Sequence, residues 1–218
     1  IRNDMKIGFV IYGSLDTVSG GYLYDRKLVE YLRAQGDTVE IMSLPWRNYG
    51  AHLSDNFHFR LPRGLDVVIQ DELNHPSLIR ANGGKHPYPV ISLVHHLRCS
   101  ELRPQWQNDF YRVVEKKYLQ DVDGFIFNSK TTEGVVSRLV DSSKPSVVAY
   151  PPTDRFGDAI SENQILKRTK GSELRILFLG NVIYRKGLHT LLKAISDQQL
   201  AVSVDVVGGL KAEPTYAE

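Results

Sequence analysis

Two adjacent histidines are the residues of this sequence best suited to chemistry. His95 and His96 directly follow the apolar segment PVISLV, whose length and β-branched residues are typical of a buried strand. Successive side chains of a strand point in opposite directions, so at most one of the two histidines faces a shared ligand site. A histidine there can hydrogen-bond a substrate or handle a proton near neutral pH. The alternative is a structural histidine that hydrogen-bonds to the backbone.

A second polar cluster follows the apolar segment DVVIQ. Asp71 and Glu72 come directly after it, with Asn74 and His75 close behind. The two carboxylates are candidates for binding a hydroxylated ligand. The alternatives are a solvated loop and, for Asn74, the cap of the next helix. Neither HxxxH spacing nor a cysteine cluster accompanies these residues, so we expect no metal site.

Two further segments favour an anionic ligand. Gly20 and Gly21 open an amphipathic segment, where glycines let a phosphate or sugar approach the backbone and a helix N-terminus offers free N–H groups. The pattern is not GxGxxG, and the alternative is a pair of tight-turn glycines. Arg185 and Lys186 stand where a later helix is expected to begin, and two cations there oppose the helix dipole unless an anion binds. A diphosphate is the natural candidate, and plain surface charge is the alternative.

These residues need a frame that brings several strand ends together. Short apolar runs alternate with longer amphipathic runs, which is typical of βαβ units and a parallel sheet. In such a sheet, ligands bind beyond the carboxyl ends of the strands. We expect strands at Lys6–Tyr12, Thr38–Ser43, Asp66–Gln70, Pro89–Val94, Gly124–Asn128 and Ser146–Ala149.

Two helices are predicted with their packing faces. Tyr22–Gln35 places Tyr24, Leu28 and Leu32 on one stripe and ends at Gly36. Glu101–Gln120 follows Ser100, a candidate N-cap, and Asn128 or Ser129 is expected to cap a later helix. The segment from Pro45 to Arg63 lacks clear periodicity, and we expect an irregular insertion with one short strand. In the second helix, we expect Trp106, Phe110, Val113, Val114 and Tyr118 to lie in the core.

The pattern predicts an α/β protein with two domains. Residues 5–150 form a doubly wound, Rossmann-like N-terminal domain. Pro151 and Pro152 begin a polar interdomain linker, residues 151–172. Residues 173–218 begin a second Rossmann-like domain with strands Leu174–Leu179 and Ser203–Val207 around a helix from about Lys186 to Asp197. These three elements are too few to close a doubly wound sheet, so we expect this domain to be truncated here.

Composition excludes several classes of protein. The 218 residues, 42% hydrophobic and 24% charged, allow one good core and the start of a second. A net charge of +2 gives no sign of nucleic-acid binding. The single cysteine, Cys99, and the lack of a signal peptide's apolar core favour the cytoplasm. No apolar run approaches the roughly 20 residues of a membrane span. Peripheral attachment to the inner membrane surface stays open.

Taken in order, the segments resemble the retaining glycosyltransferases of the large group 1 (family 4 type). That family has the GT-B fold, in which two Rossmann-like domains face each other across a cleft. The similarity spans nearly the whole chain from Met5. It is carried by SGGYLYDRKLVEYLRAQGDTVEI, DVVIQDELNHPSL, PVISLVHH, DGFIFNSKTT, VVAYPPTDRF and LRILFLGNVIYRKGLHTLLKAI.

The resemblance implies transfer of a sugar from a nucleoside-diphosphate sugar to an acceptor hydroxyl with retention, without a cofactor or a required metal. Gly20 and Gly21 would lie near the donor phosphates, and Arg185 with Lys186 on the donor diphosphate. His95, chosen by counting from Pro89, would lie near the transferred sugar. Asp71, Glu72 and His96 are the acceptor or cleft candidates. The acceptor itself would be a glycan, a lipid-linked molecule or a small molecule.

The sequence also departs from the family. Asn181 stands where the family often has an arginine, and the family's paired glutamates, which bind the donor, have no counterpart before Glu218. We therefore expect this chain alone to be inactive. Two other functions stay open: a sugar-nucleotide epimerase or hydrolase of the same fold, for which Asp71 and Glu72 would supply acid–base groups, and a non-catalytic module that binds glycans or a partner.

Overall fold

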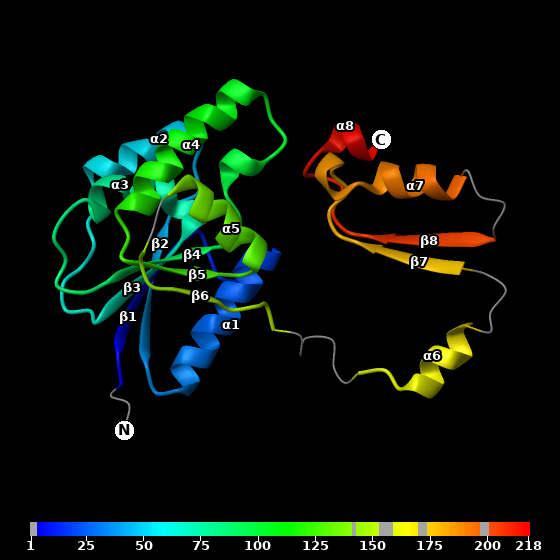
Figure 1. The fold of residues 1–218 in the computed structure, drawn as a ribbon, viewed down its shortest axis with the longest axis horizontal. Helices are drawn as coiled ribbons and strands as arrows, with labels where there is room; N and C mark the ends of the chain where they lie inside the picture. Colours follow the sequence, from blue (N-terminus) through cyan, green and yellow to red (C-terminus); the bar gives the residue numbers. More distant parts are fainter. Residues whose placement is uncertain (1–3, 141–142, 153–158, 170–173, 197–200) are drawn as a thin grey trace. The chain divides into compact units, whose positions relative to one another are not determined.

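The chain forms two compact units. The computed structural model describes residues 4–140, 143–152, 159–169, 174–196 and 201–218. Unit 1 comprises Ile1–Arg155 and unit 2 comprises Phe156–Glu218. The two units are described separately below (Figure 1).

Unit 1 is built on a six-stranded, fully parallel sheet. The order across the sheet is β2-β1-β3-β4-β5-β6. The six predicted sheet strands are found, with ends that shift by at most one residue, which confirms the α/β, Rossmann-like fold of this part, whereas the short strand expected within Pro45–Arg63 is absent from that fully described segment. The strands are β1 (Lys6–Tyr12), β2 (Thr38–Leu44), β3 (Val67–Asp71), β4 (Val90–Val94), β5 (Gly124–Phe127) and β6 (Ser146–Val148).

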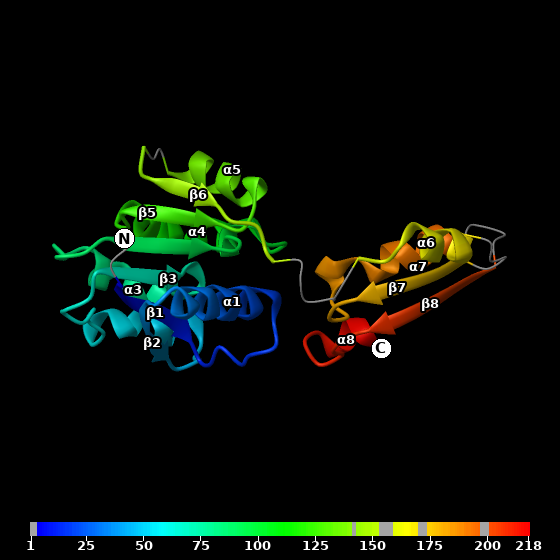
Figure 2. The ribbon, with the colours of Figure 1, turned by 90° about the horizontal axis from the view of Figure 1, so that it is seen from below.

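Helices cover both faces of this sheet. In Figures 1 and 2, α1 (Gly20–Ala34) lies on one face and α3 (His75–Asn82) with α4 (Gln105–Gln120) on the other. Residues of α5 (Lys130–Leu139) pack into the same core as α3 and α4. Each face of the sheet carries its own hydrophobic core, and side chains of β1 alternate between the two. Ile7, Phe9 and Ile11 pack on the α1 side, whereas Val10 and Tyr12 pack on the opposite side.

The helix caps follow local chemistry. Ser19 caps α1, because its hydroxyl accepts the Tyr22 N–H at 3.2 Å, and Gly36 follows the helix with a φ of 97°. Ser129 caps α5 and accepts the Thr132 N–H at 3.1 Å, as the sequence predicts. On α1 the buried stripe consists of Tyr22, Tyr24, Asp25 and Val29, with Leu28 and Leu32 only partly buried.

Helix α4 corrects two predictions. It begins at Gln105, after Pro104, and Ser100 belongs to the short turn η3 (Arg98–Ser100). Val114 and Tyr118 are buried as predicted, but the other three apolar residues are exposed: Trp106 at 71%, Phe110 at 48% and Val113 at 70%. The five residues span more of the helix circumference than one packing face, so the helix can bury only part of the set.

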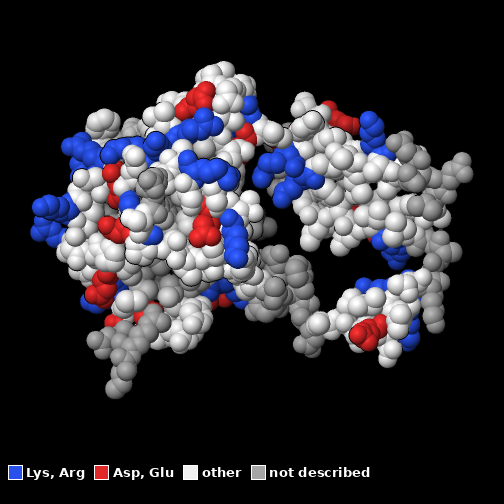
Figure 3. Space-filling view, in the orientation of Figure 1, with Lys and Arg blue, Asp and Glu red and all other residues white. Residues whose placement is uncertain are grey.

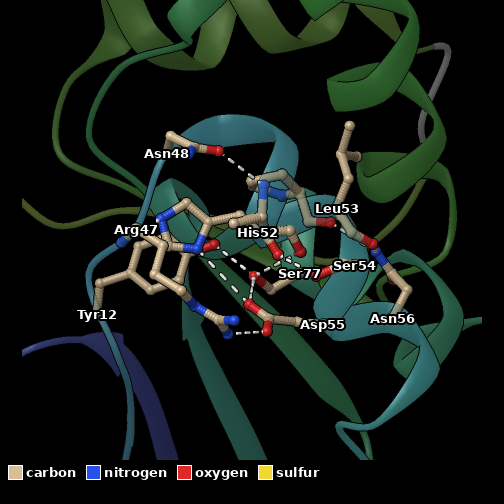
Figure 4. A network of polar contacts seen from close by, with 11 residues as sticks. Tyr12, Arg47, Asn48, His52, Leu53, Ser54, Asp55, Asn56 and Ser77 are labelled. Atoms are coloured by element: carbon tan, nitrogen blue, oxygen red, sulfur yellow. Dashed lines mark hydrogen bonds and ion pairs between the residues drawn. The ribbon is translucent and has the colours of Figure 1, made fainter.

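The segment from Pro45 to Arg63 contains α2 (Tyr49–Ser54) and η1 (Asp55–Phe57) and no strand among its residues. A polar network fixes it to the sheet (Figure 4). Ser77 of α3 donates to Asp55 Oδ2 at 2.7 Å and lies 2.6 Å from the Tyr12 hydroxyl. Arg47 pairs with the same aspartate, and His52 stacks on Tyr12 at 3.9 Å between ring centroids. His52, Arg47 and Asp55 of this segment therefore hold it against β1 and α3.

Unit 2 contains a parallel pair of strands, β7 (Leu174–Leu179) and β8 (Val202–Val207), with the helices α6 (Glu162–Thr169), α7 (Leu188–Ser196) and α8 (Pro214–Ala217). The strand ends lie close together: a Cβ on Gly208 would lie 1.9 Å from the Gly180 carbonyl oxygen. Apolar side chains of this unit are exposed, among them Leu177 at 62% and Leu179 at 63%. Among the described residues, no helix is long and apolar enough to cross a membrane.

Candidate functional site

The carboxyl ends of β1, β3 and β4 form one edge of the sheet in unit 1. The chain runs from β1 to β2 on one side and then to β3 on the other, so the crossovers change direction between β1 and β3. In open parallel sheets, ligands bind in the crevice outside such a switch point. β3 ends at Asp71, which pairs with Leu93 of β4, and His95 follows the end of β4. Asp71 and His95 therefore lie at the edge where a ligand is expected.

A buried aspartate of α1 holds His95. The His95 Nε2 lies 2.8 Å from Asp25 Oδ1, and because a carboxylate only accepts hydrogen bonds, the ring N–H donates. The Asp25 side chain is 0% exposed, whereas the His95 side chain is 18% exposed. Thr132 donates from its hydroxyl to the His95 carbonyl at 3.3 Å and so fixes the backbone. The bond to Asp25 occupies Nε2 and leaves Nδ1 as the nitrogen for a ligand.

Asp71 adds a second carboxyl group to this pair. One carboxylate oxygen each of Asp25 and Asp71 and one ring nitrogen of His95 all lie within 4.8 Å of one another. Burial, and then the charge of Asp25, raise the pKa of Asp71 well above its usual range, while His95 opposes this. Burial lowers the pKa of His95, but the hydrogen bond to Asp25 and the charges of the neighbouring carboxylates outweigh it and raise that pKa. The site thus favours the protonated imidazole more than the surroundings of an ordinary histidine do.

The first turn of α1 meets the same imidazole. A Cβ on Gly21 would lie 3.3 Å from His95 Cδ2, whereas nothing lies within 4 Å of a Cβ on Gly20. Gly21 therefore leaves room for the histidine ring, and Gly20 leaves the helix end open. Contact of these glycines with donor phosphates stays a prediction.

His96 lies in a different environment from His95. Its Nε2 lies 2.9 Å from Glu101 Oε1, and its side chain is 39% exposed. Glu101 also pairs with Arg103. The structure therefore separates the two histidines, with one bound to a buried aspartate of α1 and the other in a surface ion-pair group.

Glu72 belongs to a second buried cluster, with His75 and Glu115. One carboxylate oxygen or ring nitrogen of each residue lies within 4.8 Å of the other two. Glu72, His75 and Glu115 are 3%, 1% and 0% exposed. Glu115 accepts the backbone N–H groups of Arg98 and Cys99. The sequence suggested that Glu72 faces a ligand. In the structure the Glu72 side chain is enclosed by the protein.

Burial sets the protonation of this cluster. It raises the pKa of Glu72 to about 8, with the Glu115 hydrogen bond opposing, and raises the pKa of Glu115 to about 7 together with the charge of Glu72. It lowers the pKa of His75 to about 4. His75 Nδ1 lies 3.0 Å from the Glu72 carbonyl, and its Nε2 lies 2.8 Å from the Tyr49 hydroxyl. Both ring nitrogens are engaged, and the lowered pKa of His75 means that the cluster holds a neutral histidine near neutral pH.

Arg185 and Lys186 lie in η5 (Tyr184–Lys186) of unit 2, before α7. The predicted helix start at about Lys186 is therefore too early by two residues. Gly187 explains this, because its φ of 72° is left-handed and interrupts the helical path. Side-chain carbons of Lys186 lie 3.9 Å from the position of a Cβ on Gly180, at the end of β7. Lys186 therefore lies beside the strand end, and both cations precede the first turn of α7.

Two residues of these clusters were absent from the sequence-based candidates: Asp25 and Glu115. Asp25 follows Tyr22 by three residues and precedes Val29 by four, so it continues the apolar stripe of α1. Glu115 likewise follows the buried Val114 and precedes the buried Tyr118. A carboxylate within the buried stripe of a helix is the signal that identifies both.

Comparison with models of known protein families and with curated proteins gives no significant match.

Proposed function

We propose that this protein is a glycosyltransferase that transfers a sugar from a nucleoside-diphosphate sugar to an acceptor hydroxyl with retention. In this function unit 1 binds the acceptor side and unit 2 begins the donor-binding part. His95 contacts the transferred sugar, and Arg185 with Lys186 bind the donor diphosphate. Neither a cofactor nor a metal is required.

The Asp25–His95 pair at the switch point of the sheet is the observation that carries this proposal. A polar pair with a 2.8 Å bond and one fully buried partner costs free energy to bury, which a ligand-binding role explains. The Asp25–His95 pair lies at the edge where parallel sheets bind ligands, beside the N-terminus of α1. A protonated imidazole offers a donor N–H to a sugar hydroxyl or a phosphate oxygen.

The chemistry of sugar transfer suits such groups. As the diphosphate leaves, negative charge builds up on its oxygen atoms, and fixed cations and N–H groups stabilise that charge. Arg185 and Lys186 supply two cations in η5, and Lys186 lies beside Gly180 at the end of β7. The mixed surface charge of unit 1, with Asp and Glu between Lys and Arg on the face shown in Figure 3, gives no competing sign of nucleic-acid binding.

The test is turnover of the full-length protein with a panel of nucleoside-diphosphate sugars. Turnover is measured as the release of nucleoside diphosphate in the presence of acceptors. His95→Ala should lower turnover about 100-fold, as expected for the loss of one positioned catalytic group. His96→Ala is the matched control and should change turnover much less. Circular dichroism of both variants checks the fold.

Lys186→Ala should weaken nucleoside-diphosphate binding in calorimetry without lowering the melting temperature. Equal affinity of wild type and Lys186→Ala would refute the diphosphate assignment. Absence of turnover with every donor in the panel would refute the proposed reaction.

A sugar-nucleotide epimerase or hydrolase is the second candidate. The raised pKa of Asp71 favours it, because a carboxyl group at the switch point of the sheet can then carry a proton at a higher pH than an ordinary aspartate. Product analysis separates the two candidates: a free sugar or an epimerised product without acceptor supports this one, and a glycosylated acceptor supports transfer.

A further inference from the structure

The imidazole of His95 is enclosed by residues of one helix. Asp25 accepts from its Nε2, Gly21 leaves space for Cδ2, and Tyr24 packs edge-on with a centroid distance of 5.2 Å and an interplanar angle of 77°. All three belong to α1 within little more than one turn, so one rigid element sets the ring position.

Asp25 gains little for the fold from this position. Its side chain is 0% exposed, its Oδ1 faces His95, and its Oδ2 is buried with no hydrogen-bond partner in the part of the chain that the structure describes. An incompletely satisfied buried carboxylate destabilises a folded protein, because its lost hydration is not fully replaced. Its neighbours on the buried stripe are Tyr22 and Val29, so an apolar residue would fit the stripe better.

We propose that Asp25 is a positioning residue for His95: its carboxylate fixes the Nε2–H orientation of the imidazole, so that Nδ1 is presented to the ligand at the end of β4. Asp25 acts through the ring and does not touch the ligand. This inference rests on the proposed function for the identity of the ligand, a hydroxyl or phosphate oxygen of a sugar nucleotide. The arrangement of the pair itself is independent of it.

The charges around the ring support this role. Asp25 reaches it from α1, Asp71 from the end of β3, and Glu72 from the turn after β3. Asp71 lies close enough to join the group, but the 2.8 Å hydrogen bond to His95 is made by Asp25. Removal of the Asp25 charge should therefore alter the imidazole more than removal of the Asp71 charge.

The first experiment observes the ring directly in the 218-residue chain. With ¹⁵N-labelled histidine, the seven histidines are resolved by NMR, and His95→Gln assigns the relevant signal. In wild type, the neutral ring should carry its proton on Nε2, and the pKa of His95 should lie above the ordinary value for histidine. Asp25→Asn should lower the pKa of His95, and Asp71→Asn should lower it less.

One control variant and one matched pair of variants test whether the effect is specific to His95. Glu101→Gln removes the partner of His96 and should move the His96 signal while leaving His95 unchanged. Gly21→Ala should shift the His95 signals, because the added Cβ lies 3.3 Å from Cδ2, whereas Gly20→Ala, with free space around it, should not. The glycine pair probes the ring position without removing a buried charge, so it gives a result even if Asp25→Asn fails to fold.

The second experiment measures turnover of the full-length protein. Asp25→Asn should lower kcat with little change in KM and should shift the pH profile, and the Asp25→Asn, His95→Ala double variant should be no slower than His95→Ala. A neutral His95 ring that carries its proton on Nδ1 in wild type, or a His95 pKa unaffected by Asp25→Asn, overturns the inference. If the NMR results hold and no donor is turned over, the positioning role stands and the proposed function fails.

Discussion

Replacement of Glu72 by glutamine should make unit 1 less sensitive to alkaline pH. Burial raises the pKa of Glu72 to about 8 from an ordinary value of 4.5. The folded protein then binds more protons than the unfolded chain between these two pH values, so the free energy of unfolding falls as the pH rises through this window. At about 1.4 kcal/mol per pKa unit, the fall attributable to Glu72 between pH 5 and pH 8 is on the order of 3 kcal/mol.

Glutamine has nearly the shape of the protonated acid and cannot ionise. Glu72→Gln should therefore match wild type at pH 5 within about 1 kcal/mol and exceed it by about 3 kcal/mol at pH 8. A smaller fall should remain in the variant, because burial also raises the pKa of Glu115 to about 7.

The assay is urea unfolding at both pH values, followed by tryptophan fluorescence. Trp46 and Trp106 are the two tryptophans of the chain and both lie in unit 1, so the signal reports that unit. Glu40→Gln, at an exposed position of β2, is the matched control and should keep the wild-type pH dependence. An equal change in the free energy of unfolding between pH 5 and pH 8 for Glu72→Gln and wild type would refute this account. So would a wild-type free energy of unfolding that rises from pH 5 to pH 8.

Two further predictions concern packing. Ser77→Ala should lower the free energy of unfolding of unit 1 by about 1–3 kcal/mol, measured by urea unfolding, because it leaves Asp55 Oδ2 and the Tyr12 hydroxyl without their shared partner; Ser137→Ala, at an exposed serine of α5, is the control. An unchanged midpoint would show that the network is dispensable. Gly208→Ala should open the β7–β8 pair of unit 2 and speed thermolysin cleavage there, since its Cβ would lie 1.9 Å from the Gly180 carbonyl oxygen, whereas Gly134→Ala in α5 should not. Unchanged proteolysis would contradict that close approach.

The sheet of unit 1 could be predicted because its signals are local. Each strand is a short apolar run, and its ends follow from where the run stops, so β1 is predicted to the residue. The helix cap Ser129, which the sequence predicts, depends on chemistry within three residues. Gly187 is a local signal as well, and it marks why α7 starts later than the apolar pattern suggests.

The candidate site could be predicted only in part, because its partners meet through tertiary structure. The strand end identifies His95, but its bond to Asp25 joins residues 70 positions apart. Helical spacing places Trp106 and Tyr118 in one apolar pattern, and only the packing of α4 decides which of them is buried. For the same reason, sequence offers Glu72 as a ligand group, whereas the cluster with Glu115 encloses it.

Tyr24 ties the imidazole to the place where the chain leaves the sheet. Its hydroxyl donates to the Ala149 carbonyl at 2.8 Å, across 125 residues of sequence, while its ring packs edge-on against His95. Tyr150, Pro151 and Pro152 follow directly, and a cavity of about 480 Å³ lined by Tyr24, Tyr31, Tyr150 and Pro152 lies beside them. A displacement of the chain at Ala149 either carries the phenol ring along or breaks its hydrogen bond. The Tyr24 side chain therefore links the position of the imidazole to that of the segment by which the chain leaves the sheet.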